Sequence, residues 1–281
     1  MDTLRTTADL RARVSQWRGD RISVGLVPTM GALHEGHLAL VRRARETTDR
    51  VVVSLFVNPA QFGPNEDFET YPRNEATDAA MLAALDVDVL FAPGVPEMYP
   101  PGDETRISVP DLGGILEGEF RPGFFDGVAT VVAKLLLQCL PDRAFFGEKD
   151  YQQLLVIRRM VVDLAIPVAI EGVTTVREAD GLALSSRNAY LNEAERAAAP
   201  TLHRALADMA AKVRAGEDVI KAEMAAVAAL SEAGFNPVDY ITIRHAETLA
   251  AVTGVAEAAM PLRALAAARL GRARLIDNIP V

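Results

Sequence analysis

One short segment, Pro28-Thr29-Met30-Gly31-Ala32-Leu33-His34-Glu35-Gly36-His37, joins an apolar, β-branched run at 21–28 to a helical pattern at 36–48. A strand that passes through a glycine-containing turn into a helix is typical of the first unit of an α/β fold. Two of the four histidines of the chain lie in this segment. They are three residues apart, so they share one face wherever the backbone is helical. The segment therefore predicts both the start of a sheet and a candidate site.

Strand-like and helix-like segments alternate from here to about residue 175. Strands are expected at 51–57, 87–92, 144–146 and 168–173, and helices at 74–85, 112–140 and 151–164. Continuous apolar strands between helices are typical of a parallel sheet that is covered on both faces. We expect an α/β, doubly wound, Rossmann-like parallel sheet in residues 1–175, with ligands at the carboxyl ends of its strands.

The pattern changes after about residue 176. Two Ala-rich helical segments, 193–215 and 222–233, precede three strand-like segments without helices between them, 238–244, 262–268 and 273–277. This order predicts a second, smaller α+β domain in residues 176–281. The loop at 177–188 is expected to serve the first domain.

The composition narrows the function classes. The chain has 281 residues, of which 50% are apolar and 24% charged, as in ordinary soluble globular proteins. A formal net charge of −9 argues against a protein that coats nucleic acid or binds an anionic membrane. The single cysteine, Cys139, excludes an intrachain disulfide and a cysteine-rich zinc site. Without a signal pattern or an apolar run of ~18 residues, the chain is expected to be cytoplasmic, with no membrane or nucleic-acid partner.

The segment at 28–37 suits phosphate chemistry. A helix N-terminus offers unpaired backbone N–H groups and a partial positive charge. Gly36 lets a ligand approach the backbone closely, and His34 and His37 can face phosphate oxygens. A triphosphate site is therefore predicted. Exposed or capping histidines are the simpler alternative, and zinc is less favoured because no third ligand is suitably spaced.

A second polar run, Phe145-Phe146-Gly147-Glu148-Lys149-Asp150-Tyr151-Gln152-Gln153, follows another expected strand. The Lys149 ammonium could neutralise phosphate oxygens, and Asp150 could accept hydrogen bonds from ribose hydroxyls. The alternative is that these charges only solvate a helix start. Gln152 and Gln153 are adjacent, so at most one of them faces a site.

Two weaker clusters complete the set. The loop at 177–188 contains Ser185, Ser186 and Arg187, which could cover a polyphosphate or provide ordinary loop and capping contacts. The run Phe56-Val57-Asn58-Pro59-Ala60-Gln61-Phe62 offers two neutral amides for a hydroxyl or carboxylate, or simple turn residues. Neither a P-loop, a strand-coupled Gly-x-Gly-x-x-Gly nor a Gly-x-Ser-x-Gly elbow is present, which disfavours ATPases of that type, nicotinamide enzymes and serine hydrolases.

The four runs together resemble the pantoate–β-alanine ligase (pantothenate synthetase) family from about residue 20 to Asn278. The pattern His34-x-Gly36-His37 is similar to the signature of the nucleotidyltransferase superfamily, which includes class I aminoacyl-tRNA synthetases. The resemblance implies a Rossmann-like nucleotidyltransferase fold and a homodimer. It also implies an AMP-forming ligase that uses ATP and Mg²⁺ to join (R)-pantoate to β-alanine. The implied intermediate is a pantoyl adenylate, and the implied products are pantothenate, AMP and pyrophosphate.

The resemblance also implies residue roles. His37, as the acid, His34 and Lys149 would be catalytic. The implied ATP-binding residues are Met30, Gly31, His34, His37, Gly147, Glu148, Lys149, Asp150, Val176, Leu184, Ser185, Ser186 and Arg187. The implied substrate-binding residues are Gln61, Gln153, Asn58 and Tyr71, with a loop anchor as the alternative role of Tyr71 and the stretch 63–73 acting as a gate. Metal ligands stay unassigned among Glu66, Asp67 and Asp78.

Two departures from the family pattern are Leu184, where methionine is common, and Ala60, where a larger apolar residue is frequent. Neither removes a charged or hydrogen-bonding group. Two other functions stay open: a nucleotidyltransferase with a stable nucleotide product, and a nucleotide-binding regulator without catalysis. Gln61 and Gln153 favour a small hydroxy acid over a phosphorylated acceptor, which would need more arginine or lysine.

Overall fold

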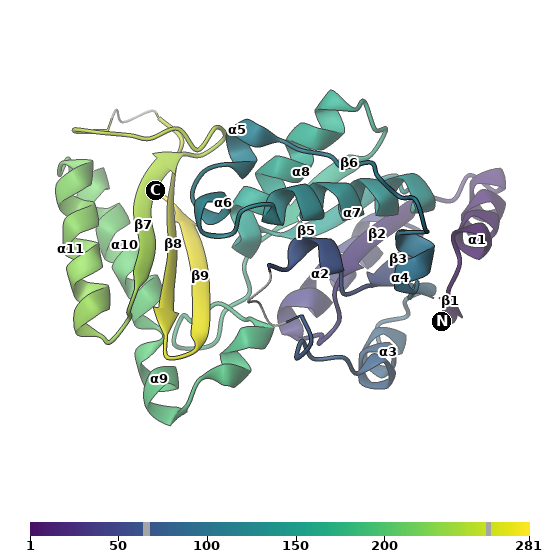
Figure 1. The fold of residues 1–281 in the computed structure, drawn as a ribbon, viewed down its shortest axis with the longest axis horizontal. Helices are drawn as coiled ribbons and strands as arrows, with labels where there is room; N and C mark the ends of the chain where they lie inside the picture. Colours follow the sequence, from purple (N-terminus) through teal and green to yellow (C-terminus); the bar gives the residue numbers. More distant parts are fainter. Residues whose placement is uncertain (64–67, 257–259) are drawn as a thin grey trace. The chain divides into compact units, whose positions relative to one another are not determined.

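The computed structural model describes residues 1–63, 68–256 and 260–281 (Figure 1). The chain forms two compact units, of which unit 1 comprises Met1–Glu148 and Gln153–Thr174 and unit 2 comprises Lys149–Gln152 and Thr175–Val281. The domain boundary between residues 175 and 176 stays a prediction. The placement of Lys149–Gln152 with unit 2 was not expected from the sequence.

Unit 1 is built on six parallel strands in the order β1-β4-β3-β2-β5-β6. The strands are Asp2–Leu4 (β1), Val24–Thr29 (β2), Arg50–Leu55 (β3), Val89–Phe91 (β4), Arg143–Gly147 (β5) and Ala169–Val173 (β6). The predicted doubly wound sheet is confirmed. Because β3 and β4 lie on one side of β2, and β5 and β6 on the other, the topological switch point lies between β2 and β5.

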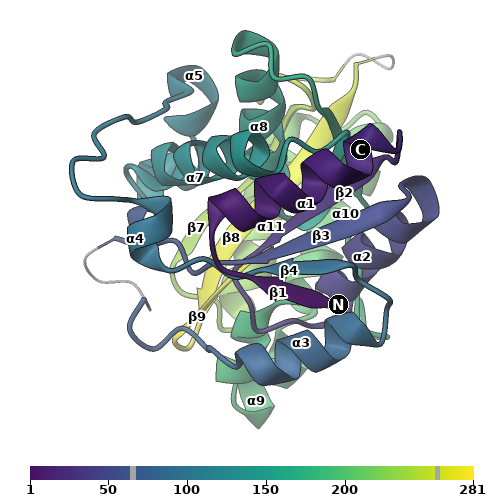
Figure 2. The ribbon, with the colours of Figure 1, turned by 90° about the vertical axis from the view of Figure 1, so that its right-hand side faces the viewer.

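Helices cover both faces of this sheet. They are Thr7–Gly19 (α1), Glu35–Thr47 (α2), Glu75–Ala83 (α3), Val95–Met98 (α4), Pro110–Gly113 (α5), Glu117–Phe120 (α6), Phe124–Cys139 (α7) and Tyr151–Asp163 (α8), with short 3₁₀ turns at Pro59–Gln61 (η1) and Glu148–Asp150 (η2). Successive strand residues point to opposite faces, so Leu26 packs in the core with residues of α1 and α7, and Val27 in the core with residues of α2 and α3. Figure 2 shows α1 and α7 on one side of the sheet and α2 and α3 on the other. In the described part of the chain, no helix has both the length and the apolar character needed to cross a membrane.

Two regions of unit 1 differ from the sequence prediction. β1 and α1 were not predicted, although Leu10, Val14 and Trp17 of α1 are buried at helical spacing. The helix predicted at 112–140 is instead divided into α5, α6 and α7. The divisions fall at Gly114, the C-cap of α5, and at Gly123, whose φ of +79° suits glycine and not a continuing helix.

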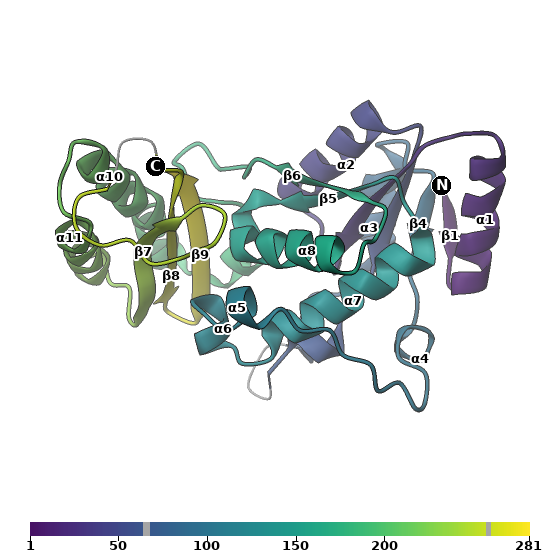
Figure 3. The same ribbon diagram turned by 90° about the horizontal axis from the view of Figure 1, so that it is seen from above.

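Unit 2 contains the predicted smaller α+β fold. Its antiparallel sheet has the order β7-β8-β9, with strands Val238–His245, Leu262–Leu270 and Ala273–Pro280. The helices Glu193–Ala198 (α9), Thr201–Arg214 (α10) and Val219–Glu232 (α11) follow the 3₁₀ turn Ser186–Tyr190 (η3). α10 and α11 cover one face of the sheet (Figure 3). The helix predicted at 193–215 is interrupted at Pro200, which lacks the N–H that a continuous helix needs.

Candidate active site

In unit 1, the predicted polar runs begin where β2, β3 and β5 end. β2 ends at Thr29, β3 at Leu55 and β5 at Gly147. These three strands are neighbours and parallel, so their carboxyl ends meet at one edge of the sheet. Ligands of open α/β sheets bind at this edge, beside the switch point.

The loop after β2 is held by a carboxylate on α3. Gly31 and Ala32 have positive φ values of 87° and 51°, so this loop needs external support. Both carboxylate oxygens of Asp78 provide it, because one accepts the Ala32 N–H at 3.0 Å and the other the Leu33 N–H at 2.9 Å. Asp78 is 2% exposed. Its contacts give it a role in shaping the loop.

Two histidines cap the helix that follows. His34 Nδ1 accepts the Gly36 N–H at 3.1 Å, and His37 Nδ1 accepts the His34 N–H at 3.3 Å, which completes a capping box. The ring centroids are 4.2 Å apart. Since each Nδ1 is an acceptor, the neutral rings carry their proton on Nε2. His34 is therefore the N-cap and not a residue of the helix face, but both rings remain together at the N-terminus of α2.

Asn58 and Gln61 lie with Met30 at the end of β3. Asn58 Nδ2 donates to Gln61 Oε1 and to the Gly127 carbonyl, both at 3.1 Å. Asn58 Oδ1 accepts the Ala60 N–H and the Tyr99 hydroxyl. Gln61 Nε2 in turn contacts Met30 Sδ at 2.9 Å. The Asn58 amide is thus fully used within the protein and orients Gln61, and its predicted contact with substrate stays a prediction.

Two residues outside the predicted set support this cluster. Burial raises the pKa of Tyr99 to about 12, so its hydroxyl remains a donor to Asn58 at neutral pH. Gly127 on α7 permits the close approach of η1, because a Cβ at this position would lie 2.2 Å from the Ala60 carbonyl oxygen.

The remaining predicted residues of unit 1 occupy varied positions. Tyr71 is buried and packs edge-on against Phe62, with ring centroids 5.8 Å apart, as a loop anchor does. Gln153 on α8 is half-buried, whereas the adjacent Gln152, in unit 2, is buried. Among the described residues, leaving out its two chain neighbours, no atom lies within 4 Å of a Cβ placed on Gly147. The predicted gate at 63–73 includes residues 64–67, which lie outside the described residues together with the metal candidates Glu66 and Asp67.

In unit 2, Val176 and Leu184 are brought together by a hairpin-like loop. The Leu184 N–H donates to the Val176 carbonyl at 3.0 Å, and the Glu178 N–H donates to the Leu182 carbonyl at 2.8 Å. The turn passes through Gly181, which has a φ of +94°. A side chain there would also press on His203, only 2.7 Å from the position of a Cβ.

Lys149 and Ser185 both line one small cavity within unit 2. Ser185 is the N-cap of η3, and its hydroxyl accepts the Arg187 N–H at 3.3 Å. Lys149 and Asp150 lie in η2. The cavity is lined by Lys149, Leu182, Ala183, Ser185, Asn188, Leu202, His203, Leu275, Ile276 and Asp277. Unit 2 thus places two predicted phosphate contacts, the lysine and the first serine, around one hollow.

Among the described residues, no group of three or more histidine, cysteine, aspartate or glutamate side chains could hold a metal ion. Mg²⁺ commonly binds through substrate phosphates and water with one or two carboxylates, which needs no such group.

Sequence reasoning missed several supporting residues. Asp78 was considered only as an unranked metal candidate, and Tyr99, Asp277 and Asn278 were given no role. Asp78 and Tyr99 act on partners 45 and 41 residues away, respectively. No local spacing indicates such pairs.

The comparisons with known proteins agree along the whole chain. A family model described as pantoate-beta-alanine ligase matches residues 2–280. The pantothenate synthetase of Paramagnetospirillum magneticum is 59% identical over 278 residues, which cover 99% of this chain and 97% of that protein. The crystal structure of pantothenate synthetase from Thermus thermophilus has a TM-score of 0.92 at 52% identity and covers 99% of both chains. The pantoate-beta-alanine ligase of Francisella tularensis, complexed with beta-gamma ATP and beta-alanine, has a TM-score of 0.83 at 35% identity, covering 100% of this chain and 97% of that one.

Proposed function

The chain belongs to the pantoate–β-alanine ligase family, and on that premise we propose that it joins (R)-pantoate to β-alanine at the expense of ATP. The products are pantothenate, AMP and pyrophosphate. Cytoplasmic location, expected from the sequence pattern, and a homodimer, implied by the family resemblance, are parts of the same proposal.

The observation that carries the proposal is the pair of imidazoles at the N-terminus of α2. They lie directly after β2, beside the switch point of a parallel sheet, and the backbone holds both through Nδ1. Each Nε2–H can then donate to a phosphate oxygen. A helix N-terminus adds the partial positive charge that a triphosphate needs.

The first step needs positioning and charge stabilisation more than a protein nucleophile. A pantoate carboxylate oxygen forms a bond to the α-phosphorus of ATP, and the bond from that phosphorus to the bridging oxygen breaks. Pyrophosphate leaves, and a pantoyl adenylate remains. His34 and His37 donate to the oxygens on which negative charge develops, with His37 as the acid. Met30 and Gly31 border the nucleotide in the same loop.

Side-chain amides of unit 1 bind pantoate in this proposal. Gln61, held by Asn58 and Met30, donates to pantoate, and Gln153 supplies a second amide. Tyr71 packs against Phe62 and anchors its loop. In the second step the β-alanine amine attacks the activated carbonyl, the carbon–oxygen bond to AMP breaks, and the amine loses its proton. Exclusion of water during this interval protects the adenylate from hydrolysis.

We assign the phosphate and nucleoside contacts of unit 2 in the same way. Lys149 pairs with phosphate oxygens, and Ser185, Ser186 and Arg187 bind the terminal phosphates. Asp150 accepts from the ribose, and the family resemblance assigns Gly147 and Glu148 to the nucleoside. Val176 and Leu184, joined by a backbone hydrogen bond, contact adenine. Leu184 stands where the family commonly has methionine, and the absence of the thioether changes only a packing contact with adenine.

In this proposal Mg²⁺ reaches the site bound to ATP, as part of the MgATP substrate. When bound, the ion would take most of its oxygens from the phosphates and from water, as Mg²⁺ commonly does. Asp78 is committed to two backbone N–H groups and shapes the loop instead. When bound, the ion neutralises phosphate charge.

The test is pyrophosphate release from MgATP with pantoate alone, with β-alanine alone and with both. We expect sustained release and AMP formation only with both substrates, and a single burst with pantoate alone. Sustained release with a stable nucleotide product would favour a simple nucleotidyltransferase. ATP binding without release under any condition would favour a nucleotide-binding regulator.

A further inference from the structure

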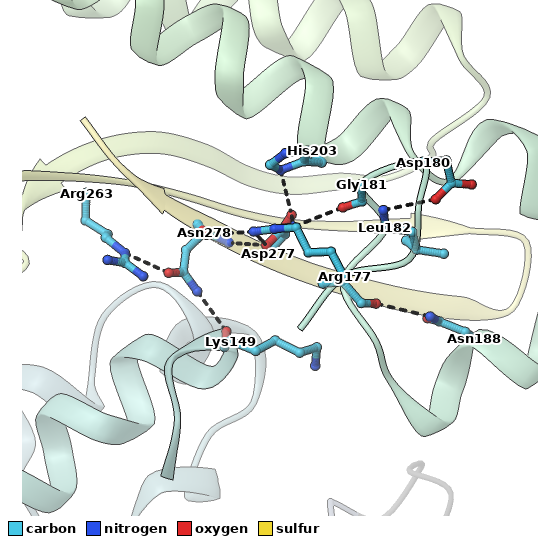
Figure 4. A network of polar contacts seen from close by, with 11 residues as sticks. Lys149, Arg177, Asp180, Gly181, Leu182, Asn188, His203, Arg263, Asp277 and Asn278 are labelled. Atoms are coloured by element: carbon cyan, nitrogen blue, oxygen red, sulfur yellow. Dashed lines mark hydrogen bonds and ion pairs between the residues drawn. The ribbon is translucent and has the colours of Figure 1, made fainter. Parts of the chain in front are cut away.

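A polar network in unit 2 joins the last strand to both segments that carry the proposed phosphate contacts (Figure 4). We propose that Asp277 and Asn278 on β9 are positioning residues. Together they fix the position of Lys149 relative to the loop that leads to Ser185. This inference rests on the proposed function for its consequence. The contacts lie entirely within unit 2.

Asn278 fixes the backbone that carries Lys149. Its Oδ1 accepts Arg263 Nε at 2.7 Å, and its Nδ2 donates to the Lys149 carbonyl at 2.8 Å. The donor and the acceptor each face a partner of opposite kind, so the amide has one satisfactory orientation. Arg263 is itself held over the Tyr151 ring, 4.1 Å from its centroid. These contacts explain why Lys149–Gln152 belong to unit 2.

Asp277 fixes the loop on the other side. Its two oxygens accept from Arg177 Nη1 at 2.6 Å and Nη2 at 2.9 Å. Arg177 also donates to the Gly181 carbonyl at 3.1 Å, at the tip of the loop. His203 Nδ1 lies 3.5 Å from Asp277, a longer contact that is an ion pair only when the imidazole is protonated. The loop is therefore held at its base and at its turn.

The strand makes these two attachments interdependent. Asp277 and Asn278 are consecutive residues, paired in register with Ala266 and Leu265 of β8. Both are 3% exposed, so their hydrogen bonds do not compete with water. The Lys149 side chain extends away from Asn278 (Figure 4). Asn278 thus constrains the lysine backbone and leaves its ammonium directed elsewhere.

The decisive variant is Asn278→Asp. The carboxylate still accepts from Arg263 but places an oxygen, in place of an N–H donor, against the Lys149 carbonyl. We expect the Kd for MgATP and the KM for ATP to rise about tenfold to 100-fold, the range that a misplaced binding group produces. The KM values for pantoate and β-alanine should not change. Binding is measured by calorimetry without the other substrates, so this readout does not require ligase activity.

Arg177→Lys tests the other attachment. Lysine retains the positive charge beside Asp277 but loses the planar fork that reaches Gly181 at the same time. We expect a higher Kd for MgATP here too. Should either variant fail to fold, the other still tests the inference.

Asp239→Asn is the matched control. It breaks the partly buried pair between Asp239 on β7 and Arg274 on β9, a contact of 2.6 Å in the same sheet. Asp239 and Arg274 belong to neither proposed phosphate segment. We expect lower thermal stability with an unchanged Kd for MgATP.

The outcomes separate the two proposals. Unchanged MgATP affinity in both folded variants, or an equal loss in Asp239→Asn, would overturn the positioning role and leave the ligase assignment intact. Weaker MgATP binding confined to Asn278→Asp and Arg177→Lys would support it. A wild-type protein that binds MgATP but makes no pantothenate would overturn the ligase assignment alone.

Discussion

His34 and His37 combine a structural and a chemical role in the same rings. Each uses Nδ1 to accept a backbone N–H at the start of α2. Only Nε2 can therefore carry the proton that a phosphate oxygen receives as a hydrogen bond. The cap also prevents the rings from rotating away, so they need little reorganisation during the reaction.

His37→Ala should slow adenylate formation by about 10²–10³-fold, the usual cost of a lost transition-state donor. The lost acceptor for the His34 N–H should also lower stability by about 1 kcal/mol. Rapid-quench measurement of pyrophosphate, with thermal unfolding, separates the two effects. Arg42→Ala, which breaks an exposed pair on the same helix, is the control and should leave the rate unchanged. A folded His37→Ala protein with full activity would remove His37 from the mechanism.

Gly147 and Gly127 differ in what surrounds them, and this difference gives a second prediction. Gly147→Ala should fold normally, because no described residue other than its chain neighbours has an atom within 4 Å of the added Cβ. It should nevertheless raise the KM for ATP if the nucleoside occupies that space. Gly127→Ala should instead destabilise the protein, because its Cβ would lie 2.2 Å from the Ala60 carbonyl oxygen. Substrate titrations and thermal unfolding of both variants provide the comparison. An unaltered KM for ATP in Gly147→Ala would place the nucleoside elsewhere.

At the level of elements, the sequence predicts what local periodicity encodes. β2 to β6 are short apolar runs bounded by polar turns, and each was expected near its observed position. α1 has three buried apolar residues at helical spacing, but its remaining residues are mostly polar, and no helix was predicted there. The bracing of the Met30–His34 loop by α3 could not be predicted, because Asp78 contacts Ala32 and Leu33 across a long sequence separation.

Asp78→Asn tests this bracing between α3 and the loop. The amide nitrogen of asparagine cannot accept an N–H, so one of the two loop contacts is lost and a buried donor is left unsatisfied. We expect a loss of about 1–3 kcal/mol in the free energy of unfolding, with a lower kcat because the helix cap shifts. Urea denaturation and steady-state kinetics measure both. Glu75→Gln on the same helix, which breaks an exposed pair with Arg5, should cost less than about 1 kcal/mol; an equal loss in the two variants would contradict the bracing role.

For the whole molecule, the change of pattern after residue 176 was enough to predict a second α+β unit. It was not enough to place Lys149–Gln152, which lie far along the chain from most of unit 2. Their attachment depends on Asn278, a residue 129 positions away from Lys149. Asp277 and Arg177 are likewise 100 residues apart. Local composition describes the units of this protein, whereas long-range polar pairs set the details of its proposed phosphate contacts.

The same pairs predict how unit 2 responds to acid. Burial by itself raises the pKa of Asp277, but the contacts with His203 and Arg177 outweigh it and hold the pKa below the ordinary value of an aspartate. A carboxyl with a lowered pKa in the folded state stabilises it above the unfolded pKa, and this contribution is lost as the pH falls through the folded pKa. Unit 2 should therefore weaken as the pH drops below about 4, near the unfolded pKa of aspartate.

Asp277→Asn tests this acid dependence. At pH 7 it should destabilise unit 2 by about 3 kcal/mol, because Arg177 loses its buried partner. The variant should then lose less additional stability than the wild type on acidification, because the titrating carboxyl is gone. Hydrogen exchange of peptides from β8 and β9, followed from pH 7 to pH 3 with correction for the intrinsic rate, reports on this unit without assuming that the whole chain unfolds in one step. Parallel acid profiles in the two proteins would show that another group governs the transition.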